Sequence, residues 1–136
     1  MNMHVQYVGS LRTEARHQKS GVQIFTDAPP DNQGKGESFS PTDLMSTSLA
    51  ACQMTIMGIL AKREGIMLDG LKADVVKIMS ADLPRRVVEI QVNYTTTESL
   101  KALPQEQKAK LIQAAKTCPV ALSIHPDIKQ NVTFDF

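Results

Sequence analysis

The N-terminal part of the chain alternates apolar and polar residues over short stretches, which predicts β-strands. The three stretches are His4–Val8, Leu11–His17 and Val22–Thr26. Gly9-Ser10 separates the first two and Ser20-Gly21 separates the second from the third, and both pairs are typical of tight turns. We therefore expect a hairpin that the third strand extends into a meander.

A polar segment rich in turn-forming residues follows, from Asp27 to Phe39, and it contains two prolines and two glycines. A loop of about 13 residues is long for a compact domain, and such loops often serve as lids or binding loops. The same composition also suits a plain mobile connection. The sequence leaves both interpretations open.

The clearest helix signal begins at Ser40. Ser40 suits the N-cap, Pro41 suits the first helical position, and Asp43 completes a capping box with Asp in place of the usual Glu. We expect this helix to end near Glu64, because Gly65 is a typical terminating residue. At about 100° per residue, one stripe of the helix comprises Met45, Ser48, Leu49, Cys52, Ile56 and Ile59. Further apolar residues surround this stripe, so the helix is expected either at the centre of the domain or under a second subunit.

The rest of the chain mixes strands and helices. We expect strands over Leu71–Ser80 and Arg86–Thr96, a helix over Pro104–Lys116, a turn or short helix over Pro119–Ile124, and a final strand over Asn131–Phe136. The order β-β-β-α-β-β-α-(α)-β is typical of an α+β fold with a mostly antiparallel sheet. We assign residues 1–136 to a single domain.

Composition and charge exclude several classes of protein. The chain has 136 residues, of which 42% are hydrophobic and 21% charged, as in ordinary soluble domains rather than disordered chains. The net charge is +1 and no basic block occurs, so nucleic acid and anionic membranes are not expected as partners. The apolar stretch Leu44–Ala61 contains Ser, Thr and Gln, which predicts a buried helix rather than a membrane span. Met1–Gly9 lacks the apolar core of a signal peptide, so we expect a cytoplasmic protein.

Candidate chemistry centres on two cysteines, which are too few for a disulfide framework. Cys52 falls on the expected apolar stripe, where it is either an inert core residue or a reactive thiol that needs a nearby cation to favour its thiolate. Cys118 precedes Pro119 and is expected at a helix N-cap, where N–H groups favour a thiolate, unless it is only a conformational stop. The histidines are scattered and no Cys-x-x-Cys pair occurs, so no metal site is expected.

Two motifs resemble those of the OsmC/Ohr family. The segment Ser40-Pro41-Thr42-Asp43-Leu44, followed by Ala50-Ala51-Cys52, is similar to the family's Asn-Pro-Glu-x-Leu … Ala-Cys helix start. The segment Cys118-Pro119-Val120 is similar to the family's Cys-Pro-Val motif. The separation of the cysteines and the order of the elements also fit, so the resemblance covers nearly the whole chain.

This resemblance implies an OsmC-like fold, in which long central helices are wrapped by sheets from both chains of an intertwined homodimer. It also implies reduction of organic hydroperoxides, with Cys52 as the peroxidatic thiolate and Cys118 as the resolving thiol. The cycle would pass through a sulfenic acid and a disulfide. The resemblance implies no metal or flavin cofactor, and the reductant would be an external dithiol such as a lipoyl group.

The resemblance further implies an arginine beside the thiolate, where a guanidinium favours the ionised sulfur and can orient the peroxide. In Ohr-type members this arginine follows the first strand in a Gly-Gly-Arg turn. Here Gly9-Ser10-Leu11-Arg12 places Arg12 near that position, and Arg16 is the second candidate. In OsmC-type members the arginine comes from the later loop, where this chain has only Lys35, a poorer group for bidentate pairing.

The family's catalytic Glu directly follows the Pro of the first motif, and here that position is Thr42. Asp43 lies about 180° from Cys52 around the helix, so helix capping is its simplest role. Glu37 is another candidate partner for the arginine. The candidate site therefore comprises Cys52, Cys118, Arg12, Glu37 and Asp43. Because the family Glu is absent, a second hypothesis stays open, namely a weakly active or non-catalytic dimer that binds a small hydrophobic ligand.

Overall fold

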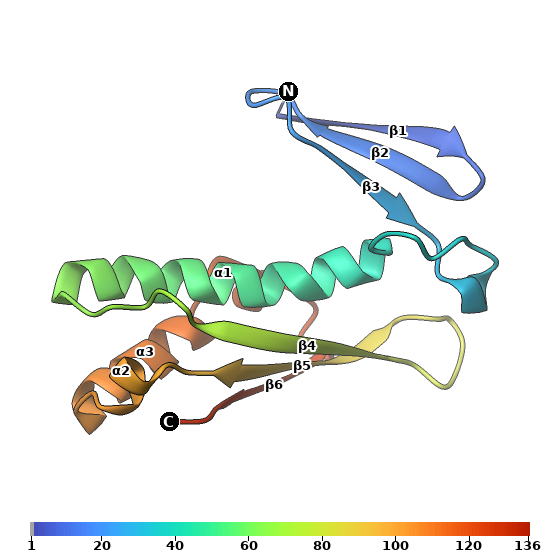
Figure 1. Cartoon of the computed structure of the whole chain (residues 1–136). Coiled ribbons are helices and arrows are strands. Elements are labelled where there is room, and N and C mark those ends of the chain that lie inside the picture. The colour runs from blue at the N-terminus through green and yellow to red at the C-terminus, as the bar shows by residue number, and fades with distance from the viewer. Residues whose placement is uncertain (1) are drawn as a thin grey trace. The chain divides into compact units, whose positions relative to one another are not determined.

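The computed structural model describes residues 2–136. Contacts within the chain divide it into two compact units, the first ending at Met45 and the second spanning Ser46–Phe136. Figure 1 shows strands β1–β3 in the first unit and strands β4–β6 with several helices in the second. The long helix α1 begins in the first unit and continues in the second. The α+β class predicted from the sequence is confirmed.

The first unit contains an antiparallel three-stranded sheet in the order β1-β2-β3. Its strands are β1 (Met3–Gly9), β2 (Arg12–His17) and β3 (Gln23–Asp27). The predicted hairpin and meander are therefore confirmed. The register of the second pair places Arg12 opposite Asp27, at the edge where the sheet meets the following loop.

The segment between β3 and α1 forms a closed loop. The Asp27 N–H donates to the carbonyl of Phe39 at 3.0 Å, so the two ends of the loop are joined. A 3₁₀ turn, η1 (Pro30–Asn32), lies within it. A Cβ atom on Gly34 would lie 1.7 Å from the carbonyl oxygen of Ala28, so this close approach requires glycine. Joined ends and internal packing are the features of a compact Ω-loop.

The long helix α1 (Pro41–Glu64) begins and ends where the sequence predicts. The Asp43 N–H donates to Ser40 Oγ at 3.0 Å, and the Ser40 N–H donates to Asp43 Oδ2 at 2.9 Å, which is a reciprocal capping box. Gly65 follows the last turn with a φ of 68°, the left-handed conformation that terminates helices.

The second unit contains a three-stranded sheet in the order β4-β5-β6. Its elements after α1 are β4 (Lys72–Met79), β5 (Val87–Thr95), α2 (Glu98–Lys101), α3 (Gln105–Lys116), α4 (Pro119–Ser123) and β6 (Lys129–Phe134). β4 and β5 are antiparallel, whereas β5 and β6 are parallel, because the three helices between them form the long crossover that parallel neighbours require. The sequence predicts these elements except for the single turn α2, and it does not predict the parallel pair.

The face of α1 that packs in the core differs from the predicted stripe. The buried residues of α1 are Ser46, Leu49, Ala50, Gln53, Met57 and Ala61. Of the predicted stripe, Ile59 is 57% exposed and Cys52 is only half-buried. Within the single chain the predicted stripe is therefore not the face that packs, because α1 is apolar on most sides and apolar spacing alone does not select a face. The face that packs carries Gln53, whose side chain accepts a hydrogen bond from Tyr94 on β5.

Among the described residues, α1 is also the one helix long and apolar enough to cross a membrane, judged by length and composition. Its contacts are those of a core helix. Ser46 and Gln53 are both about as buried as the neighbouring Leu49, and Gln53 is hydrogen-bonded to the sheet.

Candidate functional site

The structure brings the side chains of the two cysteines together in the second unit. Cys52 lies within α1, and Cys118 directly precedes α4. Their thiols lie close enough for each to influence the other, and both cysteines are free. Cys52 is half-buried, whereas Cys118 is fully buried. An accessible thiol close to a buried thiol is an arrangement that suits oxidation of the first and disulfide formation with the second.

Cys118 occupies the N-cap of α4, as the following Pro119 predicts. Its sulfur accepts a hydrogen bond from the Ala121 N–H at 3.3 Å. Burial raises the pKa of the Cys118 thiol above its ordinary value, the Ala121 N–H partly offsets this, and the neighbouring Cys52 raises the pKa further. The N–H groups at this N-cap lower the pKa of Cys118, as expected, but burial outweighs them and the net shift is upward. The structure holds Cys118 as a neutral thiol.

A buried tyrosine that is not among the predicted site residues lies beside the Cys118 thiol. Tyr94 on β5 is 3% exposed, and its hydroxyl donates to Gln53 Oε1 at 2.8 Å. Burial, and next the neighbouring Cys118, raise the pKa of Tyr94. Gln53 directly follows Cys52 in the chain, so this hydrogen bond ties α1 to β5 next to the thiols. A glutamine inside an apolar helix is the sequence signal, because a buried amide requires a polar partner.

In the first unit, a carboxylate holds Arg12 in a fixed orientation. The Nε and Nη2 atoms of Arg12 donate to Oδ1 and Oδ2 of Asp27 at 2.7 and 2.8 Å, which is bidentate pairing. The guanidinium carbon also lies 5.9 Å from the centroid of the Phe25 ring. The Arg12 guanidinium holds the pKa of Asp27 below its usual range, and Asp27 raises the pKa of Arg12. Both groups are therefore charged, and the Arg12 side chain stays 28% exposed.

Asp27 is not among the site residues predicted from the sequence. The predicted strand ends one residue short of it, and Asp27 falls in the predicted loop. The signal was nevertheless present, because the turn at Ser20-Gly21 sets the register of β2 and β3 and thereby pairs Arg12 with Asp27. Asp27 is 1% exposed, and carboxylates this buried are nearly always paired.

The remaining candidates make weaker or different contacts. Glu37 Oε2 lies 3.7 Å from Arg12 Nη2, and the Glu37 side chain is 64% exposed, so it is a secondary partner of the guanidinium. The Glu37 N–H donates to Asp27 Oδ2 at 3.1 Å, which joins the loop to the ion pair. The Asp43 carboxylate closes the capping box of α1. Arg16 is exposed on β2.

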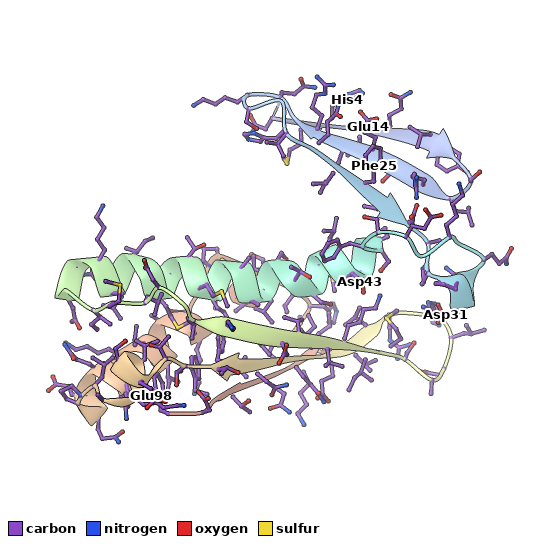
Figure 2. All side chains as sticks on the ribbon, viewed as in Figure 1. His4, Glu14, Phe25, Asp31, Asp43 and Glu98 are labelled. Carbon is purple, nitrogen blue, oxygen red and sulfur yellow. The ribbon has the colours of Figure 1, made fainter. Side chains whose placement is uncertain are left out.

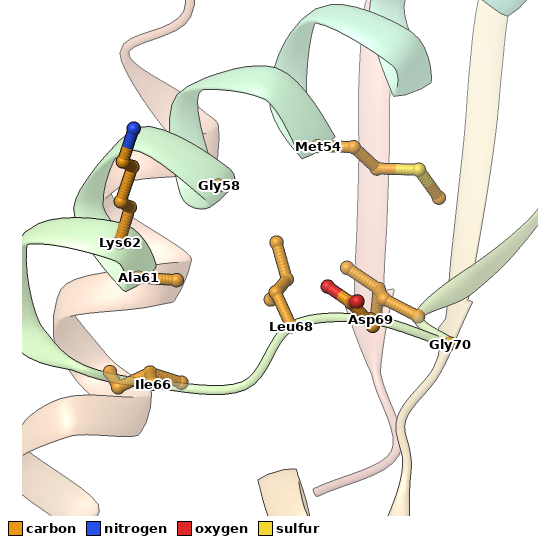
Figure 3. A pocket seen from close by; sticks show the side chains of 9 residues that line it. Met54, Gly58, Ala61, Lys62, Ile66, Leu68, Asp69 and Gly70 are labelled. Atoms are coloured by element: carbon orange, nitrogen blue, oxygen red, sulfur yellow. The ribbon is translucent and has the colours of Figure 1, made fainter.

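A hollow of about 360 Å³ lies between the C-terminal half of α1 and the segment that leads into β4. Figure 3 shows Met54, Leu68 and Ile66 in its lining, together with the polar residues Lys62 and Asp69. Neither cysteine lines this hollow, so it is separate from the thiols. Within residues 2–136, no group of three or more His, Cys, Asp or Glu side chains is placed to hold a metal ion.

Comparisons with known proteins agree on one family. The model of the family described as OsmC-like protein matches residues 34–133. No curated protein sequence matches the chain. Among solved structures, the chain is similar to an osmotic stress induced and detoxification response protein from Psychrobacter arcticus 273-4, with 49% sequence identity, a TM-score of 0.92, and coverage of 98% of this chain and 95% of that one.

More distant structures share the fold. An organic hydroperoxide resistance protein OsmC from Legionella pneumophila is 15% identical, with a TM-score of 0.75 and coverage of 100% of this chain and 98% of that one. An OsmC-like protein from Mycoplasma pneumoniae is 20% identical, with a TM-score of 0.78 and coverage of 97% and 93%. At these identities the likeness concerns the fold.

Proposed function

Because the chain belongs to the family of OsmC-like proteins, we propose that it reduces organic hydroperoxides through Cys52 and Cys118 in defence against oxidative stress. The observation that carries this proposal is the closeness of the two thiols, one half-buried and one fully buried. The names of two similar proteins give further support. The Psychrobacter protein is a detoxification response protein, and the Legionella protein is an organic hydroperoxide resistance protein.

The proposed reaction has two oxidative steps. The Cys52 thiolate attacks the terminal peroxide oxygen, an S–O bond forms as the O–O bond breaks, and the alkoxide leaves as an alcohol after taking up a proton. Cys52 is then a sulfenic acid. The Cys118 sulfur attacks the Cys52 sulfur, a disulfide forms, and hydroxide leaves as water with the proton of the Cys118 thiol. An external dithiol, such as a lipoyl group, reduces the disulfide by exchange and restores both thiols.

Arg12 is the cation assigned to this chemistry. A guanidinium held by bidentate pairing presents its remaining N–H groups in one orientation, which suits stabilisation of a thiolate and of the peroxide oxygen. Asp27 supplies the carboxylate that the family motif would place at Thr42, so the absence of that Glu does not leave Arg12 unheld. Glu37 is a secondary partner at 3.7 Å, and Asp43 contributes by fixing the start of α1.

The test treats the fully reduced protein with one equivalent of cumene hydroperoxide and counts free thiols over time. Both thiols are expected to disappear together, with one equivalent of alcohol formed. Cys52→Ser should not react, and Cys118→Ser should stop at a sulfenic acid that dimedone traps. Persistence of both thiols over minutes would overturn the proposal. The alternative of a hydrophobic-ligand-binding dimer, favoured by Thr42 in place of the family Glu, would then replace it.

The proposal includes a homodimer in the cytoplasm. One face of the β1-β2-β3 sheet carries apolar residues with large exposed fractions, namely Met3 (68%), Val5 (62%), Tyr7 (63%) and Ile24 (46%). The opposite face carries His4, Glu14 and Phe25, which Figure 2 labels on β1, β2 and β3. An apolar sheet face of this kind is normally covered, and a second copy of the chain is the cover we propose. A thiol cycle with a dithiol reductant suits the reducing cytoplasm.

A further inference from the structure

A second, separate feature of the molecule is a groove between α3 and β6, which we call the α3–β6 groove. Its volume is about 370 Å³, within the range of small-molecule sites. Its apolar part is formed by Ile112 of α3, by Val132 and Phe134 of β6, and by Phe136, and two lysines of α3, Lys108 and Lys116, also line it. Neither cysteine belongs to this groove.

Lys108 is the unusual member of the groove. It is 8% exposed, although lysine is among the residue types least often buried. Its ammonium lies 5.6 Å from the centroid of the Phe136 ring, a cation–π contact, and no carboxylate of residues 2–136 pairs with it. Buried cations are normally paired with an anion. The ammonium of Lys108 instead faces the Phe136 ring.

Two neighbouring lysines on α2 and α3 do have carboxylate partners. Lys101 lies 3.6 Å from Glu98 and 3.7 Å from Asp135, and Lys110 lies 2.9 Å from Glu64. Of the lysines on α2 and α3, Lys108 and Lys116 are the two without a carboxylate partner in the described part of the chain, and both line the groove. Unmatched positive charge and apolar surface therefore coincide at one place.

Aromatic stacking gives the groove a firm wall. The Phe134 ring stacks on Tyr94 at a centroid distance of 4.6 Å and on Phe136 at 5.3 Å, and the planes are within 11° and 4° of parallel. Tyr94 is in turn held by its hydrogen bond to Gln53. A wall fixed in this way is pre-organised to receive an apolar chain.

From these observations we propose that the α3–β6 groove binds an amphipathic monocarboxylate, such as a medium-chain fatty acid. The apolar chain lies against Ile112, Val132 and Phe134, and the carboxylate lies at Lys108 and Lys116. The carboxylate is attracted to both ammonium groups and offsets one of their two positive charges, and burial of the chain removes apolar surface from water. This site is independent of the thiol chemistry and does not rest on the proposed function.

The test uses isothermal titration calorimetry of the reduced full-length protein with decanoate, kept below its critical micelle concentration. We expect one decanoate per chain, binding at least tenfold tighter than decanol, which has the same chain without the charge. Lys108→Met should weaken binding at least tenfold, whereas Lys108→Arg should retain it. The matched control is Lys129→Met, which removes an exposed lysine of β6 outside the groove and should bind like the unaltered protein.

Several results would overturn the proposal. Decanol that binds as tightly as decanoate would show an apolar groove with no role for the lysines. The proposed site would be excluded if Lys108→Met bound decanoate with unchanged affinity. It would also be excluded if titration of the unaltered protein with decanoate up to millimolar concentration gave no heat of binding. Loss of binding in Cys52→Ser would place decanoate at the thiols instead. Lys116→Met is the second variant if Lys108→Met does not fold, and retained affinity in it would contradict the proposed charge contact.

Discussion

The bidentate pair of Arg12 and Asp27 is the reason we propose Arg12, rather than Arg16, as the arginine that serves the thiolate. Arg12→Ala is expected to slow oxidation of Cys52 by cumene hydroperoxide by about 10²–10³-fold, the usual loss when one pre-organised donor is removed from a reacting centre. Arg16 lies exposed on the same strand and makes no such pair, so Arg16→Ala is the matched control and should keep the original rate. The measurement is the rate of thiol loss under excess peroxide. The opposite ranking would show that Arg12 is a structural residue only.

The raised pKa of Cys118 predicts two pH dependences. A thiol whose folded pKa lies above its unfolded value of about 8.5 stabilises the fold fully below that pH, and the contribution is lost as pH rises through the folded pKa. The free energy of unfolding should therefore fall between about pH 8 and pH 10, and Cys118→Ser should show a smaller fall. Site-resolved alkylation by iodoacetamide should give Cys118 a midpoint above the ordinary thiol value. In Cys52→Ser that midpoint should drop but stay raised, because burial is the largest cause.

Tyr94 and Gln53 give a prediction about stability. Tyr94→Phe removes the donor of a buried 2.8 Å hydrogen bond and leaves Gln53 Oε1 without it. The expected loss is about 1–3 kcal/mol of unfolding free energy, measured by urea denaturation. Tyr7→Phe is the comparison, because Tyr7 is 63% exposed in the single chain and its hydroxyl accepts only an exposed 3.2 Å hydrogen bond from the Leu11 N–H, so the loss should be within about 0.5 kcal/mol. Equal losses in the two variants would contradict a special role for the buried pair.

Single residues differ in how far the sequence reveals them. Cys52 and Cys118 stand in contiguous motifs, and Pro119 marks the N-cap position of Cys118, so local sequence was enough. Asp27 and Tyr94 act through partners 15 and 41 residues away in the chain. Such pairs exist only after strands and helices have taken their register. The turn at Ser20-Gly21 constrains that register for Arg12 and Asp27, whereas no residue near Tyr94 in the sequence indicates its partner.

At the scale of elements, the loop between β3 and α1 offers a sharp prediction about Gly34. Gly34→Ala would force its Cβ to within 1.7 Å of the Ala28 carbonyl oxygen, so the backbone must move at a cost of about 1–3 kcal/mol. If the closed loop is destabilised by about 1.4 kcal/mol, the fraction of molecules with an open loop rises tenfold. The rate of tryptic cleavage after Lys35 should rise with it. Gln33→Gly is the control, since Gln33 has a φ of 67° and gains from glycine. Cleavage of Gly34→Ala at the original rate would show that the loop is already open.

Helices and strands were predictable from the sequence where the residues at their ends are capping or turn-forming residues. The capping box at Ser40 and the glycine at position 65 fix α1 at both ends, and the turns at Gly9 and Gly21 fix the meander. The orientation of α1 about its axis was not predictable, because both sides are apolar. A buried Gln53 settles it in the structure, through a partner on β5.

At the scale of the whole molecule, the two units differ in what they bury. All buried apolar residues of the described chain, from Leu49 to Cys118, belong to the second unit. The buried residues of the first unit are polar, namely Thr26, Asp27 and Ser40. A three-stranded sheet needs a covered apolar face for stability, so the first unit requires apolar cover. The family's intertwined homodimer is the arrangement we expect to supply it.

The dimer can be tested on the exposed sheet face itself. Ile24→Lys puts a charge on the apolar face of the β1-β2-β3 sheet, where burial of an isoleucine side chain is worth about 1.5–3 kcal/mol. Loss of this buried isoleucine side chain should raise the dimer dissociation constant, measured by sedimentation equilibrium, by roughly 10- to 100-fold. Gln23→Lys, the neighbouring position on the opposite face, is the matched control and should leave the dimer intact. If the unaltered protein sediments as a monomer at every concentration, the homodimer is excluded and the apolar face must be covered within one chain. A dimer that resists Ile24→Lys would instead place its interface elsewhere, on a surface such as the exposed side of α1 around Ile59.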